Sequence, residues 1–130
     1  MPRPPLNVVL DASALLTLVQ GGRGADAVRV RLPDAAVSAV SLAEAVWVLC
    51  RNGVPAADAR AALEPLVPSP VAFSGEQLWQ AGDLYQTAHA AGLTPGDYAC
   101  LTLARHSDRA ILTADSAWKR LDLGVRVILI

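Results

Sequence analysis

The stretch "NVVLDASALLTL", residues 7–18, places a carboxylate between two segments that both have the composition of a protein core. The apolar run "LNVVL" at residues 6–10 predicts a strand that is buried on both faces. Apolar residues at helical spacing follow Asp11 and stop at a Gly pair, residues 21–22. Asp11 is therefore either a helix cap or a group that serves chemistry at the end of a sheet.

The composition predicts one domain with apolar surface to spare. The chain has 130 residues, of which 53% are hydrophobic and 18% are charged, against about 25% charged in a typical soluble domain. A domain this small cannot bury so much apolar surface alone, so part of it is expected to face another chain. We predict a flexible N-terminal tail at residues 1–6 and a single domain at residues 7–130.

Several classes of protein are disfavoured. No apolar run approaches the roughly 18 residues that span a membrane, and the start "MPRPPLN" has no signal-peptide core, so a cytoplasmic protein is expected. Cys50 and Cys100 lie in apolar helical patterns and are expected to be reduced, buried thiols. His89 and His106 are too scattered for a zinc site, so the ligands of any metal would be oxygens.

Strands and helices alternate along the chain, which predicts an α/β domain with a mainly parallel central sheet of about five strands flanked by helices. The expected strands are residues 6–10, 35–40, 70–73, 110–113 and 125–130. The expected helices are residues 12–22, 24–32, 41–53, 55–67, 75–92, 94–108 and 115–124.

Four carboxylates occupy positions where each has an ordinary explanation. Asp11 and Asp115 follow strands and suit helix caps. Glu44 pairs with Ser41 as a capping box in "SLAE", and Asp97 in "TPGD" lies in the first turn of a helix, where the helix dipole favours negative charge.

Topology brings the same four carboxylates to one edge of the sheet. In a parallel α/β sheet the strand carboxyl ends and the helix amino ends lie along a single edge, where ligands bind. Converging acids would repel one another unless a cation neutralised them. A site made only of oxygen ligands suits Mg²⁺ or Mn²⁺, and the matching chemistry is metal-assisted hydrolysis of a phosphodiester.

With these residues identified, the chain resembles a PIN-domain ribonuclease, specifically the VapC-type toxin of a toxin–antitoxin pair. The resemblance rests on four segments that match the acidic motifs of this family in order and spacing and extend over nearly the whole chain. They are "VVLDASALLTLV", "SAVSLAEAVWVL", "GLTPGDYACLTLAR" and "AILTADSAWKRL".

The resemblance implies an acidic catalytic pocket made of Asp11, Glu44, Asp97 and Asp115. It makes Asp11 and Asp97 direct ligands of Mg²⁺ or Mn²⁺, and it gives Glu44 and Asp115 the task of binding a second ion or orienting water. Ser13 and Thr113 match small hydroxyl positions beside the acids, where they would hydrogen-bond the ligands. The implied partners are an RNA substrate, a cognate antitoxin and a second copy of the chain.

Other functions stay open from the residues alone. A receiver-like phosphoacceptor domain would have an acidic pair after the first strand, and a haloacid-type phosphatase would have an Asp at position 13, where Ser13 stands. A non-catalytic α/β interaction module is the third alternative. We also expect the basic residues Arg105, Arg109, Lys119 and Arg120 near the acidic edge, where solvated surface charge is the first interpretation of each and contact with phosphates is the alternative.

Overall fold

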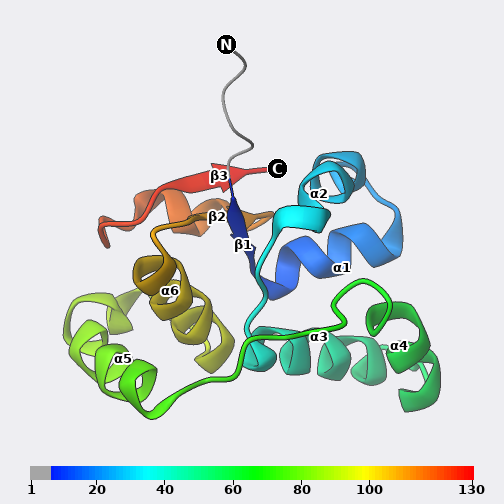
Figure 1. Cartoon of the computed structure of the whole chain (residues 1–130), viewed down its shortest axis with the longest axis horizontal. Helices are drawn as coiled ribbons and strands as arrows, with labels where there is room; N and C mark the ends of the chain where they lie inside the picture. The colour runs from blue at the N-terminus through cyan, green and yellow to red at the C-terminus, as the bar shows by residue number, and fades with distance from the viewer. Residues whose placement is uncertain (1–6) are drawn as a thin grey trace.

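A parallel sheet of three strands forms the centre of the described part of the chain, which is residues 7–130 of a computed structural model (Figure 1). The strands are β1 (Val8–Leu10), β2 (Ala110–Thr113) and β3 (Val127–Leu129), in that spatial order. Their register pairs Val9 with Ile111 and Ile111 with Val127. The tail predicted at residues 1–6, together with Leu6 of the first predicted strand, lies outside the described residues.

Two further segments extend the sheet by one bridge each, so the parallel α/β fold that the sequence predicts is confirmed. Val9 pairs with Ala36 and Ser38 pairs with Val71, both in parallel. The strand predicted at residues 35–40 is shorter than expected, because α3 already begins at Ala39, where the Ser38 hydroxyl accepts a hydrogen bond from the Val40 amide. The strand predicted at residues 70–73 likewise pairs through a single residue.

The helices follow the predicted order with small shifts at their ends. Within the described residues the α-helices are α1 (Ala12–Gln20), α2 (Ala25–Arg31), α3 (Ala39–Arg51), α4 (Ala56–Leu63), α5 (Gly75–Ala88) and α6 (Pro95–Ser107). The same described residues contain three short 3-10 helices, η1 (Leu32–Asp34), η2 (His89–Ala91) and η3 (Ser116–Arg120). Cys50 and Cys100 are free thiols, as expected, but only Cys100 is buried, whereas Cys50 is partly buried.

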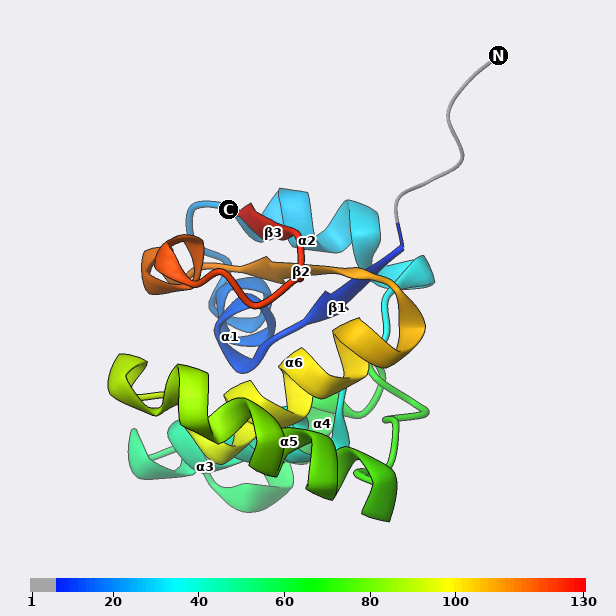
Figure 2. The same ribbon diagram turned by 90° about the vertical axis from the view of Figure 1, so that its left-hand side faces the viewer.

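Successive residues of the strands point to opposite faces of the sheet, and this alternation divides the core in two. Val8, Leu10 and Leu112 pack with α1–α4 on one face. Val9 and Ile111 pack with α5, α6 and η3 on the other face. Figure 1 shows α1 and α2 on one side of the strands and α5 and α6 on the other, and Figure 2 shows α5 and α6 side by side. Among the described residues no helix combines the length and the hydropathy needed to cross a bilayer.

The short helix η3 is held in place by Trp118, and this packing can be tested. Trp118 is only 2% exposed and belongs to the core cluster under α5 and α6. Replacing it by alanine should lower the free energy of unfolding by about 3–5 kcal/mol, because removal of a large buried side chain leaves a cavity. Urea denaturation followed by circular dichroism measures this change.

Val30→Ala is the control, because Val30 is 77% exposed on α2. Its removal should change the stability of the monomer by no more than about 0.5 kcal/mol. Equal decreases in the two variants would contradict the packing described for Trp118.

Candidate active site

Asp11 is a buried carboxylate at the point where β1 ends and α1 begins. It is 3% exposed and caps α1, as its position predicts, by accepting a hydrogen bond from the Ala14 amide at 2.9 Å. The same oxygen, Oδ1, accepts from the Ser13 hydroxyl at 2.7 Å. The second oxygen, Oδ2, accepts from the Thr113 hydroxyl at the end of β2. Both oxygens of a buried carboxylate are thus satisfied, which burial requires.

Ser13 and Thr113 join the carboxyl ends of β1 and β2. Their hydroxyl oxygens lie 3.1 Å apart. The Ala114 amide donates to Ser13 Oγ at 2.9 Å, and the Asp115 amide donates to Thr113 Oγ1 at 3.0 Å. The two hydroxyl residues therefore lie between Asp11 and the backbone that carries Asp115.

Asp115 lies at the surface beside this network. Its side chain caps η3 by accepting from the Ala117 amide at 2.9 Å. Asp115 is the most exposed of the four acids, since Asp11 is buried and Glu44 and Asp97 are partly buried.

Asp97 lies in the first turn of α6, where it forms a capping box with Thr94. The Asp97 amide donates to Thr94 Oγ1 at 3.2 Å, and the Thr94 amide donates to Asp97 Oδ2 at 3.0 Å. The box fixes the start of the helix and the direction of the Asp97 side chain.

Glu44 bridges α3 and the amino end of α6. Its Oε1 accepts from the Gly96 amide at 2.9 Å, and its Oε2 accepts from the Thr94 hydroxyl at 3.0 Å. Ser41, one turn earlier on α3, donates to the Gly96 carbonyl at 3.1 Å. The predicted capping box of Ser41 and Glu44 is therefore wrong, because Ser38 caps α3 and both side chains reach across to α6.

Gly96 makes this close approach of α3 and α6 feasible. A Cβ atom at Gly96 would lie 2.2 Å from Glu44 Oε2 and 2.4 Å from the Glu44 carboxyl carbon. Any side chain at this position would therefore displace the carboxylate. Gly96 was not predicted as a site residue, and the only signal for it in the sequence is its place between Pro95 and Asp97 at a helix start.

The electrostatics identify Asp97 as the centre of the group of acids. Burial raises the pKa of Asp11, its hydrogen bonds with Thr113, Ser13 and Ala14 oppose this rise, and the charge of Asp97 adds to it. Desolvation likewise raises the pKa of Asp97; its bonds with Thr94 oppose the rise, and the charges of Glu44 and Asp115 add to it. Asp97 therefore interacts with each of the other three acids.

The arrangement fits a cation in its chemistry, although it is not a closed cage. Within residues 7–130 no three acidic, histidine or cysteine side chains lie close enough to form a ready-made metal site. Each carboxylate is instead held by cap or bridging hydrogen bonds, while Asp97 Oδ1 and Asp115 Oδ2 accept none from the described residues. Oxygen ligands with unfavourable mutual repulsion and free lone pairs suit a hard divalent ion such as Mg²⁺.

The basic residues divide between two ends of the molecule. Lys119 and Arg120 lie on η3, directly after Asp115, as expected. Arg105 and Arg109 do not lie near the acids, because Arg109 immediately precedes β2 and Arg105 is in the last turn of α6. The predicted position of Arg105 and Arg109 near the acids was therefore wrong. The acids lie at the start of α6 and just after the end of β2, whereas these two arginines lie at the opposite ends of the same two elements.

The close approach of Gly96 and Glu44 gives a testable consequence. Gly96→Ala should expel the Glu44 carboxylate from the start of α6 and lower the free energy of unfolding by about 1–3 kcal/mol, because hydrogen bonds to a charged group are broken. Thermal and urea unfolding measure the change, and faster exchange of the residue 96 amide would report the broken bond directly.

Gly82→Ala on α5 is the control, since a Cβ atom there meets nothing within 4 Å. This substitution should stabilise the protein by about 0.5–1 kcal/mol, as alanine does in a helix interior. A Gly96→Ala variant that gains stability as Gly82→Ala does would contradict the bridge.

Comparison with known proteins agrees with the fold. The sequence model of the PIN domain matches residues 8–123. No curated protein matches the chain by sequence.

Solved structures share the fold at low sequence identity. One is VapBC2 from Rickettsia felis bound to a DNA fragment from its promoter, with a TM-score of 0.75 and 13% identity over 96% of this chain and 99% of that one. PAE2754 from Pyrobaculum aerophilum has a TM-score of 0.62 and 21% identity, over 94% of this chain and 90% of that one. FitAB bound to the IR36 DNA fragment has a TM-score of 0.65 and 16% identity, over 93% of each chain.

The family match covers nearly all of the described residues, including the four acids, the sheet strands β1 and β2, and the helices that carry the acids. On this ground the chain belongs to the PIN domain family.

Proposed function

We propose that this chain is a metal-dependent endoribonuclease and acts as the toxin of a toxin–antitoxin pair. PIN domains are generally nucleases, and the family match includes every acid of the candidate site. The observation that carries the proposal is that hydrogen bonds hold Asp11 beside the strand end that carries Asp115, and Glu44 against the start of the helix that carries Asp97. Desolvation, and then the charges of Glu44 and Asp115, also raise the pKa of Asp97. A cluster of this kind gains stability from a divalent cation.

The four acids have distinct roles in this proposal. Asp11 and Asp97 hold Mg²⁺ or Mn²⁺ directly, and Glu44 and Asp115 bind a second ion or orient water. Ser13 and Thr113 keep the Asp11 carboxylate in a fixed direction through the hydrogen bonds described above. When bound, a divalent ion supplies hydroxide from water at neutral pH and offsets the charge on the phosphoryl oxygens.

Two of the matched structures support the toxin part of the proposal. The Rickettsia felis protein is a VapBC complex and FitAB is a second complex, and both are bound to DNA fragments. By analogy we assign this chain an antitoxin partner. A toxin that cleaves cellular RNA would act in the cytoplasm.

The first test removes single charges from the site. Asp97→Asn keeps an oxygen that can accept the hydrogen bond from the Thr94 amide, but it removes the negative charge that lies among the other acids. RNA cleavage at equal Mg²⁺ should fall by about 100-fold or more, in line with the removal of one electrostatic stabiliser from an active site. Asp11→Asn, Glu44→Gln and Asp115→Asn should also lower the rate, which gel electrophoresis of cleaved RNA measures.

Asp58→Asn, in the exposed first turn of α4, makes the same change of charge away from the site and should cleave RNA at the wild-type rate. Unchanged cleavage by both Asp11→Asn and Asp97→Asn would exclude the acidic pocket as the active site.

The second test concerns the metal. Mg²⁺ or Mn²⁺ should support RNA cleavage and EDTA should abolish it, because the ligands are carboxylate oxygens. Zn²⁺ should not be required, and Ca²⁺ should support turnover poorly because its coordination is less rigid. Full activity in metal-free buffer containing EDTA would refute the proposed mechanism.

Exposed apolar side chains support protein partners. On α5 Leu78 is 51% exposed, Trp79 is 74% exposed and Tyr85 is 58% exposed, while Trp47 on α3 is 63% exposed. Leu78 and Tyr85 line one hollow between α5 and the start of α6, and large exposed apolar side chains of this kind mark interaction surfaces. We propose that this surface serves a homodimer and an amphipathic antitoxin segment, and that an antitoxin Arg or Lys reaching the acids competes with the metal ion.

We take the proposed antitoxin to be the protein encoded by the gene next to that of this chain. Light scattering after size exclusion should show a dimer of the free chain and a larger complex with this neighbouring gene product. Trp79→Ser should weaken one or both assemblies, because Trp79 supplies the most exposed ring on α5. Val30→Ser, a 77% exposed position on α2, is the control and should assemble normally. A wild-type chain that is monomeric and does not bind the neighbouring gene product would remove the support for a toxin, although it would leave the ribonuclease proposal unaffected.

A further inference from the structure

Three arginines line one hollow at the end of the sheet opposite the acids. Arg105 comes from the last turn of α6, Arg109 immediately precedes β2, and Arg126 immediately precedes β3. The hollow measures about 270 Å³, and its other lining residues are Ala104, Asp108, Ala110, Gly124 and Val125.

The positive charge in this hollow is largely uncompensated. Arg105 and Arg126 make no side-chain hydrogen bond or ion pair with any residue in 7–130. Arg109 donates from Nη1 to the Asp34 carbonyl at 3.1 Å, which satisfies part of its guanidinium without neutralising it. Asp108 is the single acid among the lining residues and forms no ion pair with any of the three. Three positive charges therefore face one negative charge.

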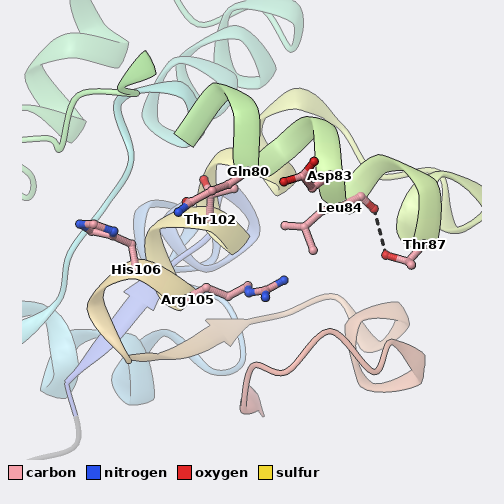
Figure 3. A pocket seen from close by; sticks show the side chains of 7 residues that line it. All are labelled: Gln80, Asp83, Leu84, Thr87, Thr102, Arg105 and His106. Carbon is pink, nitrogen blue, oxygen red and sulfur yellow. Dashed lines mark hydrogen bonds between the residues drawn. The ribbon is translucent and has the colours of Figure 1, made fainter. Parts of the chain in front are cut away.

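Arg105 also lines a second hollow, of about 470 Å³, between α5 and α6. Figure 3 shows Arg105 and His106 extending from α6, with Gln80, Asp83 and Thr87 opposite on α5. Within the described part of the chain Asp83 and Arg105 form no salt bridge, so the guanidinium stays free to meet a ligand where the two hollows adjoin.

We propose that the arginine hollow binds a backbone phosphate of the RNA substrate, remote from the bond that is cut. A guanidinium presents a planar fork of donors that matches phosphate oxygens, so the residue type fits this ligand better than lysine would. The hollow has no aromatic side chain among its lining residues on which a base could stack. It therefore suits a backbone phosphate of an RNA strand whose bases lie outside the hollow, rather than a free nucleotide.

The position of the hollow favours a polymer. Arg109 and Asp115 flank β2, whose four residues span roughly 13 Å at the usual rise of a strand. An RNA strand carries several phosphates and can contact the residues at both ends of β2 at once, whereas a dinucleotide has a single phosphate. Lys119 and Arg120 on η3 place further positive charge beside the acids, so basic side chains stand at both ends of such a path. This inference rests on the proposed ribonuclease function.

The test measures RNA binding by the full chain in EDTA, which stops cleavage. Fluorescence anisotropy of a labelled 12-nucleotide RNA, over a series of salt concentrations, gives the affinity and its salt dependence. For Arg105→Ala/Arg126→Ala the slope of log K against log salt should shrink by about 0.7 for each phosphate that the protein no longer neutralises. Both side chains are exposed, so the fold should be preserved, which circular dichroism verifies.

Arg23→Ala/Arg51→Ala is the matched control, since both arginines are exposed, one between α1 and α2 and one on α3, outside the hollow, and the change of net charge is the same. Its slope should stay at the wild-type value. A dinucleotide, which is too short to reach the hollow from the acids, should bind the two double variants equally. Equal slopes for the hollow variant and the control with the 12-nucleotide RNA would overturn the proposal.

Inorganic phosphate separates the two sources of the ligand. If millimolar phosphate shifts the NMR signals of the Arg105 and Arg126 side chains while RNA leaves them unmoved, the hollow is a site for free phosphate and the proposal falls. Failure of the ribonuclease proposal is seen separately, as an absence of metal-dependent cleavage by the wild-type chain. Metal-dependent cleavage with equal salt slopes would reject the hollow alone.

Discussion

The buried carboxylate of Asp11 is the constraint on which the candidate site depends. At 3% exposure it cannot rely on water, and an unsatisfied buried polar group costs about 1–3 kcal/mol. The chain satisfies it from three places: the first turn of α1, the Ser13 hydroxyl, and the Thr113 hydroxyl from the neighbouring strand. The last bond requires β1 and β2 to end at the same level, which the register of Leu10 with Leu112 provides.

A second polar contact brings the remaining acids to that point. Glu44 accepts hydrogen bonds from the start of α6 and thereby sets α3 against α6, with the absence of a side chain at Gly96 leaving room for the carboxylate. Asp97 follows at once in the same turn and lies within electrostatic range of Asp11, Glu44 and Asp115. Each acid is therefore held by a structural hydrogen bond and is also part of one electronegative site. The hydrogen bonds that hold the acids are therefore compatible with the proposed metal site.

Local signals in the sequence were sufficient for much of this arrangement. The caps at Asp11 and Asp115 depend on neighbours within three residues, and the buried strands β1 and β2 have almost purely apolar sequences, so both could be predicted. The partner of Glu44 could not, because Gly96 is 52 residues away and a capping box with Ser41 satisfied the local pattern. Arg105 and Arg109 lie away from the acids although both are close to the motifs in sequence, because α6 and β2 each separate their two ends in space. The strand at residues 35–40 was predicted too long because Ser38 starts a helix that apolar composition alone does not reveal.

A crystal structure of the chain soaked with Mn²⁺, with anomalous diffraction data, tests the central claim most directly. The account predicts an anomalous peak at the edge formed by the ends of β1 and β2 and the start of α6, bound by carboxylate oxygens of Asp11 and Asp97, with that peak absent in Asp97→Asn. A peak elsewhere on the molecule, or an empty acidic edge at saturating Mn²⁺, would contradict the claim that these acids form a metal site.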